Sequence, residues 1–265
     1  MFFLGDVHNR FDHILPSVLP HLEAGRENHV IFLGDIQCER PFEERIEPLL
    51  AAGLGVWFIH GNHDTDKQEE WDNLAASAHR NLHARVVEID GVRVAGLGGV
   101  FRGAIWHPDI HKPHTDESYD GRRFPGHWSW DDYQRMLQRQ RKDKRAPVTS
   151  KQDGRLRKHL SSIFPQDYVT LMNQRADILV THEAPSCHPF GFEEIERVAR
   201  AMGASKVFHG HQHDCLDYSG WESRFRVEAF GVGLRGITDL DGMKVLDGET
   251  DFSPKVWNRP RSVEG

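Results

Sequence analysis

The sequence has little cysteine and no long apolar run. Its three cysteines, Cys38, Cys187 and Cys215, are too few for a disulfide framework and form no CxxC pair of the kind that binds structural zinc. No apolar stretch approaches the roughly 18 residues that a membrane-spanning helix needs. The first residues form a strand pattern with no basic stretch or cleavage site before it, so we expect a cytoplasmic protein without membrane attachment.

The chain also lacks an excess of positive charge. It has 33 Lys and Arg against 40 Asp and Glu, and this formal net charge of −7 argues against general nucleic-acid affinity of the whole surface. A local basic patch is compatible with that balance. With 265 residues, the chain is long enough for one large core, so we expect a single domain over residues 1–265 with one elaboration.

Five short apolar runs each end in a cluster of Asp, His or Asn. Each run has the composition of a buried strand, and in open α/β sheets ligands collect at the carboxyl ends of the strands. The pattern therefore predicts one polar site built from five distant segments. The runs and their clusters are Phe2–Leu4 before Asp6 and His8, Val30–Leu33 before Asp35, Val56–Ile59 before Asn62, His63 and Asp64, Ile178–Val180 before His182, and Val207–Phe208 before His211 and His213.

Strand and helix patterns alternate over the first hundred residues. Helices are expected over 41–52 and 66–78, and in part over 11–24, where Pro16 and Pro20 interrupt the pattern. Two Asp-Gly pairs, at Asp90 and Asp241, are typical of two-residue hairpins, so antiparallel strands should join the parallel ones. A further helix is expected over 193–202, and the fold class is α/β.

Residues 101–167 interrupt this alternation and predict a cap-like insertion. Its first part, 102–130, mixes Pro, Gly, His and Trp without a period, whereas 131–164 has a helical pattern broken near Ala146-Pro147. Residues 135–158 are strongly basic, which leaves open either a solvated helix surface or a surface for a nucleotide or single strand. Trp106, Trp128, Trp130 and Tyr133 are candidates to stack a base but are more typical of a cap core, and His107, His111, His114 and His127 fit no familiar metal-ligand spacing.

Taken together, the ordered motifs resemble those of the calcineurin-like metallophosphoesterases. The resemblance covers residues 1 to about 99 and 176 to 231, and it rests on Asp6-x-His8, Gly34-Asp35, Gly61-Asn62-His63-Asp64, His182 and Gly210-His211-x-His213. It implies a four-layer β-sandwich flanked by helices, with two metal ions at one edge of the sheets. By resemblance, Asp6, His8 and His213 hold the first ion, Asn62, His182 and His211 hold the second, and Asp35 bridges them.

The ligand types indicate which metals to expect. Carboxylate, amide and imidazole groups without thiolate suit Mn²⁺ best, with Fe or Zn²⁺ as alternatives. Two such ions about 3.5–4 Å apart can activate water as the nucleophile for an in-line attack on phosphorus. His63 directly follows the ligand Asn62, and we expect His63 and Asp64 to be the catalytic side chains, with His63 protonating the leaving oxygen or stabilising developing charge.

The substrate-binding side chains are less well defined by the motifs. In protein phosphatases of this family, the Gly-Asp pair usually begins the longer motif GDxxDRG. The second Asp of that motif orients the catalytic His, and its Arg binds the substrate phosphate. This chain has Cys38 and Glu39 at those two positions. Arg40 lies one position after the expected Arg and is a candidate to replace it. The other candidates for substrate contact are Asn9, Arg10 and Arg102.

These observations predict a dinuclear metal-dependent phosphoesterase that acts on a small phosphomonoester, phosphodiester or nucleotide. Two alternatives remain open, a nuclease that holds nucleic acid through residues 135–158 and a scaffold that keeps the fold without catalysis. The intact set of seven ligands and His63 favours the enzyme. The sequence does not indicate the oligomeric state.

Overall fold

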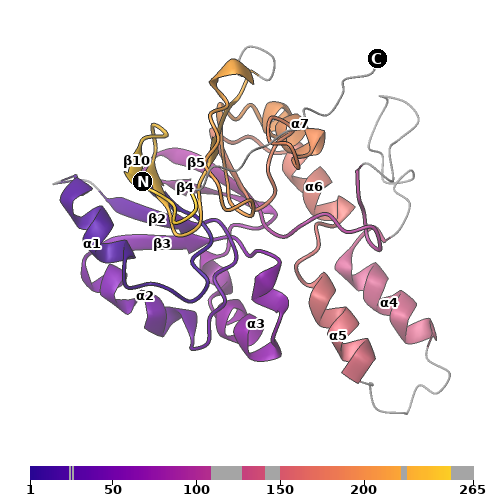
Figure 1. The fold of residues 1–265 in the computed structure, drawn as a ribbon. Coiled ribbons are helices and arrows are strands. Elements are labelled where there is room, and N and C mark those ends of the chain that lie inside the picture. The colour runs from indigo at the N-terminus through magenta and orange to yellow at the C-terminus, as the bar shows by residue number, and fades with distance from the viewer. Residues whose placement is uncertain (24, 26, 109–126, 141–149, 222–225, 252–265) are drawn as a thin grey trace.

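The fold was analysed in a computed structural model, which describes residues 1–23, 25, 27–108, 127–140, 150–221 and 226–251 (Figure 1). Two five-stranded sheets form its centre. The first has the strand order β10-β9-β1-β2-β3 and the second β4-β5-β6-β7-β8. The strands are β1 (Phe2–Leu4), β2 (Asn28–Phe32), β3 (Leu54–Phe58), β4 (Arg85–Ile89), β5 (Val92–Leu97), β6 (Ile178–Thr181), β7 (Lys206–His209), β8 (Glu228–Gly231), β9 (Ile237–Asp239) and β10 (Lys244–Leu246).

Both sheets combine parallel and antiparallel pairs, as the sequence predicts. Strands β1, β2 and β3 are parallel, and so are β5, β6, β7 and β8. The two predicted hairpins are confirmed, because Asp90-Gly91 joins the antiparallel strands β4 and β5, and Asp241-Gly242 lies between the antiparallel strands β9 and β10. Parallel pairing aligns the carboxyl ends of the strands that precede the polar clusters.

Side-chain alternation along β1 explains the four layers. Phe2 and Leu4 pack on the outer side with helices α1 (Ile14–Val18) and α2 (Phe42–Ala51), whereas Phe3 points into the space between the sheets. There the Phe3 ring stacks on Phe208 of β7, with ring centroids 3.6 Å apart and planes at 8°. A second outer core covers the other sheet with helices α6 (Pro165–Met172) and α7 (Glu193–Met202). The predicted helix–sheet–sheet–helix sandwich is therefore the observed architecture.

Seven α-helices lie in the described part of the chain. They are α1 (Ile14–Val18), α2 (Phe42–Ala51), α3 (Gln68–Ala75), α4 (Trp130–Gln140), α5 (Ser150–His159), α6 (Pro165–Met172) and α7 (Glu193–Met202).

Predicted and observed helices differ at a few ends. Helix α7 matches its predicted range and ends at Gly203, whose φ of 77° suits the left-handed cap that glycine adopts freely. The first helix is shorter than expected, because Pro16 and Pro20 reduce it to α1 and a 3₁₀ turn. Helix α6 lies beyond the predicted helical segment 131–164 and was not predicted, although Pro165 at its first turn is a usual helix start.

The insertion contributes the paired helices α4 and α5, which extend from the sheets in Figure 1. They contact each other through the rings of Tyr133 and His159, whose centroids are 4.9 Å apart. Trp106 and Tyr133 are buried in the outer core, which confirms the structural alternative for these aromatics. The predicted break at Ala146-Pro147 lies outside the described residues, as do His111 and His114. None of the described helices combines the length and apolarity needed to cross a bilayer.

Replacing Phe208 with Ala should destabilise the protein strongly. The substitution removes the ring that Phe3 stacks on between the sheets, and truncating a buried Phe costs about 3–5 kcal/mol. Urea unfolding followed by circular dichroism measures the change. Phe190→Ala is the matched control, because Phe190 is 50% exposed, and an equal loss in both variants would contradict the assigned inter-sheet core.

Candidate metal centre and active site

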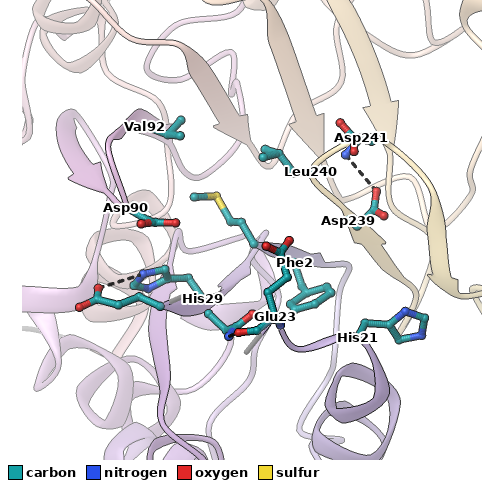
Figure 2. A pocket seen from close by; sticks show the side chains of 12 residues that line it. Phe2, His21, Glu23, His29, Asp90, Val92, Asp239, Leu240 and Asp241 are labelled. Carbon is teal, nitrogen blue, oxygen red and sulfur yellow. Dashed lines mark hydrogen bonds and ion pairs between the residues drawn. The ribbon is translucent and has the colours of Figure 1, made fainter. Parts of the chain in front are cut away.

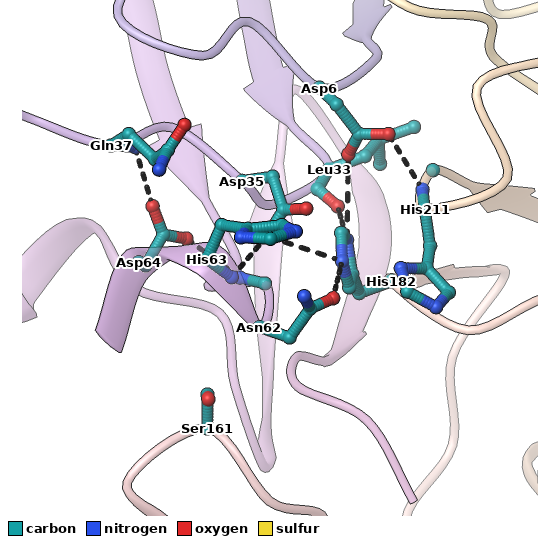
Figure 3. A network of polar contacts seen from close by, with 12 residues as sticks. Asp6, Leu33, Asp35, Gln37, Asn62, His63, Asp64, Ser161, His182 and His211 are labelled. Carbon is teal, nitrogen blue, oxygen red and sulfur yellow. Dashed lines mark hydrogen bonds and ion pairs between the residues drawn. The ribbon is translucent and has the colours of Figure 1, made fainter. Parts of the chain in front are cut away.

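The five polar clusters meet at one edge of the sandwich. The edge is formed by the carboxyl ends of β1, β2 and β3 in one sheet and of β6 and β7 in the other. Hydrogen bonds join the sheets there. The backbone N–H of His211 donates to Asp6 Oδ2 at 2.8 Å, and His182 Nδ1 lies 2.8 Å from the Leu33 carbonyl oxygen (Figure 3). We refer to this region as the site edge.

His8, Asp35 and His213 form the first group that has the geometry of a metal site, with ligand atoms within 4.8 Å of one another. The Nε2 atoms of His8 and His213 face each other at 3.2 Å. Asp6 adds a carboxylate, because its Oδ2 lies 3.4 Å from His213 Nε2. Two imidazole nitrogens and two carboxylates therefore converge on one small volume.

Asp35, His182 and His211 form the second group, again within 4.8 Å. His182 Nε2 lies 3.4 Å from Asp35 Oδ1 and 3.1 Å from Asn62 Oδ1. Asp35 belongs to both groups, which is the position of a bridging ligand. All seven side chains that the resemblance implies as ligands thus lie together at the site edge.

The backbone at the site edge adopts unusual conformations. Six residues other than glycine have φ between 42° and 68° there, in the left-handed region that most side chains avoid. Such conformations persist only where neighbouring structure enforces them, and they cluster at functional sites. Here they turn four predicted ligands toward one another. The six are His8, Asn9, Asp35, Gln37, His211 and His213.

Gly61 allows the loop after β3 to approach the ligands closely. A Cβ added there would lie 2.3 Å from Asp35 Oδ1 and 2.6 Å from His182 Cε1, too close for any side chain. Any larger residue would therefore displace the carboxylate of Asp35 or the imidazole of His182 beside it.

Two fully buried carboxylates, Asp6 and Asp35, dominate the electrostatics of the site edge. Burial raises the pKa of Asp6 well above its ordinary value. Burial opposes ionisation of Asp35 as well, but the adjacent His182 outweighs it and lowers the pKa of Asp35. Burial likewise disfavours charge on His182, yet Asp35 and Asp6 raise its pKa to about 10.

The donor atoms of the site edge fit divalent cations. Asp6 Oδ1 and Asp35 Oδ2 are buried oxygens that have no hydrogen-bond partner within the described structure. Buried charges are normally paired or coordinate a metal, and a bound cation would satisfy both oxygens. Neutral imidazoles and carboxylates in mixed sets suit Mn²⁺, Fe or Zn²⁺.

His63 lies beside the metal groups without belonging to either. Its backbone N–H donates to Asp35 Oδ1 at 2.7 Å, and its ring centroid is 5.7 Å from that of His8. The side chain is 46% exposed, so a substrate can reach it. Its Nδ1 lies 2.7 Å from Asp66 Oδ2, which orients the ring and leaves Nε2 available. Burial lowers the pKa of His63, but the hydrogen bond to Asp66 and the charges of Asp35 and Asp66 together outweigh burial and raise the pKa overall.

Asp64 occupies a different position from its neighbour. It is fully buried, and its two oxygens accept the backbone N–H groups of Gln37 and Gly61, each at 2.7 Å. It therefore joins the loop after β2 to the loop after β3. This geometry favours a supporting role for Asp64 over the catalytic role that the sequence predicts.

The four candidate substrate-binding residues are not brought together. Asn9 Nδ2 donates to Glu39 at 2.8 Å, and the exposed Arg10 lies 3.8 Å from Asp12. Arg40 lines a groove between α1 and α2, away from the ligands. Arg102 alone lines a cavity that also contains ligand residues, Asn62 and His211.

Three supporting residues were missed by sequence reasoning. Gln37 Oε1 accepts a hydrogen bond from His8 Nδ1 at 2.6 Å, which directs His8 Nε2 toward the metal groups. Glu183 accepts the N–H of Phe101 and lies 4.0 Å from His211 Nε2. The third is Asp66. Its position three residues after His63 could have indicated a side-chain pair in the sequence. Gln37 and Glu183 follow predicted ligands but belong to no recognisable sequence motif.

A cavity of about 540 Å³ adjoins the site edge. It is lined by Asn62, Thr65, Asp66, Val100, Phe101, Arg102, Gly154, Arg157, Lys158, Glu183 and His211. A separate pocket of about 340 Å³, shown in Figure 2, lies at the opposite end of the strands. Phe2 and His29 near the starts of β1 and β2 line it together with the carboxylates of Glu23, Asp90 and Asp239, so it does not favour an anionic ligand.

Comparison with known proteins identifies relatives of this chain. The family described as calcineurin-like phosphoesterase matches residues 2–215. An uncharacterized protein of Haemophilus influenzae is 37% identical over 246 residues, which cover 92% of this chain and 95% of that protein. The crystal structure of TT1561 of Thermus thermophilus is 12% identical, covers 91% of this chain and 94% of that one, and has a TM-score of 0.46.

Replacing Gln37 with Leu should weaken binding of one metal ion by about 10–100-fold, because the substitution removes the acceptor that orients His8. Competition with a chelator, with metal content counted per chain, measures the effect. Gln37→Glu keeps an oxygen acceptor and should retain most of the affinity. Unchanged affinity for both ions in Gln37→Leu would contradict the assignment of His8 as a ligand.

Proposed function

Because this chain belongs to the calcineurin-like phosphoesterase family, we propose that it is a dinuclear phosphoesterase that hydrolyses a phosphomonoester or phosphodiester of a small molecule. The family implies metal-dependent hydrolysis of phosphoesters. The observation that carries the proposal is the pair of three-residue groups that share Asp35, each with its ligand atoms within 4.8 Å.

In this proposal the seven side chains divide between two ions. Asp6, His8 and His213 would hold one ion and Asn62, His182 and His211 the other, while Asp35 would contact both. Mn²⁺ is the best candidate for this oxygen and nitrogen set. Divalent ions held there would supply a nucleophilic water at neutral pH and neutralise charge on the phosphoryl oxygens.

The chain's own contribution to the chemistry centres on His63. With Nδ1 hydrogen-bonded to Asp66, its Nε2 is the atom that holds or releases a proton. Donation from Nε2 to the leaving oxygen would assist cleavage of the ester bond. Asp66 is a positioning residue in this account, because it acts through His63. In protein phosphatases, the second Asp of the GDxxDRG motif orients the catalytic His, and this chain has the buried Cys38 at that position. Asp66 would perform the orienting role instead.

The proposal predicts turnover that depends on metal. Protein stripped of metal should hydrolyse neither p-nitrophenyl phosphate nor bis-p-nitrophenyl phosphate, and reloading with Mn²⁺ should restore hydrolysis of at least one of them. The preferred ester distinguishes a phosphomonoesterase from a phosphodiesterase. Two bound ions per chain without hydrolysis of either ester would instead support the scaffold alternative.

His63→Ala should lower kcat by about 10²–10⁴-fold while both ions stay bound, because a general acid contributes a factor of this size. Asp66→Asn should show a smaller loss that is greater for phenyl phosphate than for p-nitrophenyl phosphate, since the poorer leaving group depends more on protonation. Measurements of kcat with phenyl phosphate and p-nitrophenyl phosphate, together with the metal content of each variant, test these effects.

Asp72→Asn is the matched control for Asp66→Asn. Asp72 lies on the adjacent helix α3, is exposed and accepts a hydrogen bond from Gln68. Its replacement should leave kcat and the leaving-group dependence unchanged. Loss of metal from the His63→Ala variant would contradict the role assigned to His63. An equal loss of kcat with phenyl phosphate and p-nitrophenyl phosphate in Asp66→Asn would contradict the role assigned to Asp66.

A further inference from the structure

The cavity beside the site edge has two chemically different walls. Asn62 and His211, two predicted ligands, form part of one wall. Arg157 and Lys158, near the carboxyl end of α5 in the insertion, form part of the other. Its volume of about 540 Å³ is in the range of cavities that bind small molecules, roughly 300–1,000 Å³. A molecule in the cavity can therefore contact the site edge and α5 simultaneously.

The acidic side chains of the cavity are already engaged. Asp66 is bonded to His63, and Glu183 accepts the N–H of Phe101. In contrast, the three basic side chains, Arg102, Arg157 and Lys158, have no carboxylate within 4.0 Å in the described part of the chain. Three cations around one cavity without a partner carboxylate favour an anionic ligand.

Two of these cations are held in place by hydrogen bonds to other groups. Arg102 Nη1 donates to the carbonyl oxygens of Lys158 and Ser161 at 2.9 and 2.8 Å. Arg157 Nε donates to the Thr65 carbonyl oxygen at 3.1 Å. Each guanidinium thus uses one nitrogen to attach α5, or the loop after it, to the site edge, and its other nitrogens make no hydrogen bond to the described residues, so they can bind a ligand. Such pre-ordered donors lose little entropy on binding.

We propose that this cavity binds a second phosphate group of the substrate, so that the substrate class is a small phosphoester carrying two phosphates. This inference rests on the proposed function, in which the first phosphate occupies the metal groups. Arg157 and Lys158 then bind the second phosphate across the cavity, and Arg102 contributes from the loop after β5. The insertion thereby selects among phosphoesters, while the ligands and His63 carry out the chemistry common to them.

The test compares two substrates that differ by one phosphate, adenosine 3′,5′-bisphosphate and adenosine 5′-monophosphate. Replacing Arg157 and Lys158 together with Met should lower kcat/KM for the bisphosphate by at least about tenfold, because charge-assisted hydrogen bonds to phosphate are lost. Hydrolysis of the monophosphate and of p-nitrophenyl phosphate should change by less than about twofold. Arg155→Met, an exposed position on the same helix outside the cavity, should leave all three unchanged.

A binding measurement separates this inference from the proposed function. Calorimetric titration of metal-free protein with inorganic pyrophosphate should show at least about tenfold weaker binding in the double variant than in the unmodified protein. If the double variant binds pyrophosphate more weakly than the unmodified protein, but the metal-loaded protein hydrolyses no ester, the proposed function is wrong and the anion site is confirmed. If esters are hydrolysed but the double variant alters neither bisphosphate turnover nor pyrophosphate binding, the second-phosphate site is overturned.

Two further results would also decide the inference. Lys158→Met alone, at an exposed position, serves where the double variant does not fold, and it should show a smaller loss confined to the bisphosphate. A single-stranded oligonucleotide hydrolysed faster than the bisphosphate, with a rate falling steeply as salt rises, would overturn the small-molecule class in favour of a nuclease.

Discussion

The burial of Asp6 and Asp35 where the two sheets meet is the constraint on which the rest of the structure depends. Two carboxylates without access to water carry a large free-energy cost unless cations or donors compensate them. The surrounding loops provide that compensation through the N–H groups of His211 and His63 and through the imidazole of His182. Two carboxylate oxygens remain without a hydrogen bond within the described structure, and divalent cations would satisfy them.

This constraint explains why the loops at the site edge are so closely fitted. Left-handed backbone at His8, Asp35 and His211 turns their side chains inward, at a cost in strain that the hydrogen bonds around Asp64 help to offset. Gly61 is required because any Cβ would strike Asp35. The stacked core beneath, centred on Phe3 and Phe208, keeps the two sheets at a fixed spacing, so ligands from both can converge.

Much of the fold and the set of clustered residues could be predicted from the sequence, because strand periodicity determines where each polar cluster emerges. The seven ligand candidates lie together since their strands are parallel neighbours within each of the two stacked sheets, a consequence of topology that the resemblance supplied. Substrate contacts were harder to predict. Arg10 and Arg40 follow ligand candidates in the chain, but Arg10 lies beside Asp12 and Arg40 lines the groove between α1 and α2. Arg157 approaches Thr65 across 92 positions, a contact that no local pattern encodes.

The central claim is that two metal ions share Asp35. Anomalous diffraction at the manganese edge, from crystals of Mn²⁺-loaded protein, tests it most directly. The account predicts two peaks about 3.5–4 Å apart, with the carboxylate of Asp35 in contact with both. A single peak, or two peaks of which Asp35 contacts only one, would contradict the dinuclear site.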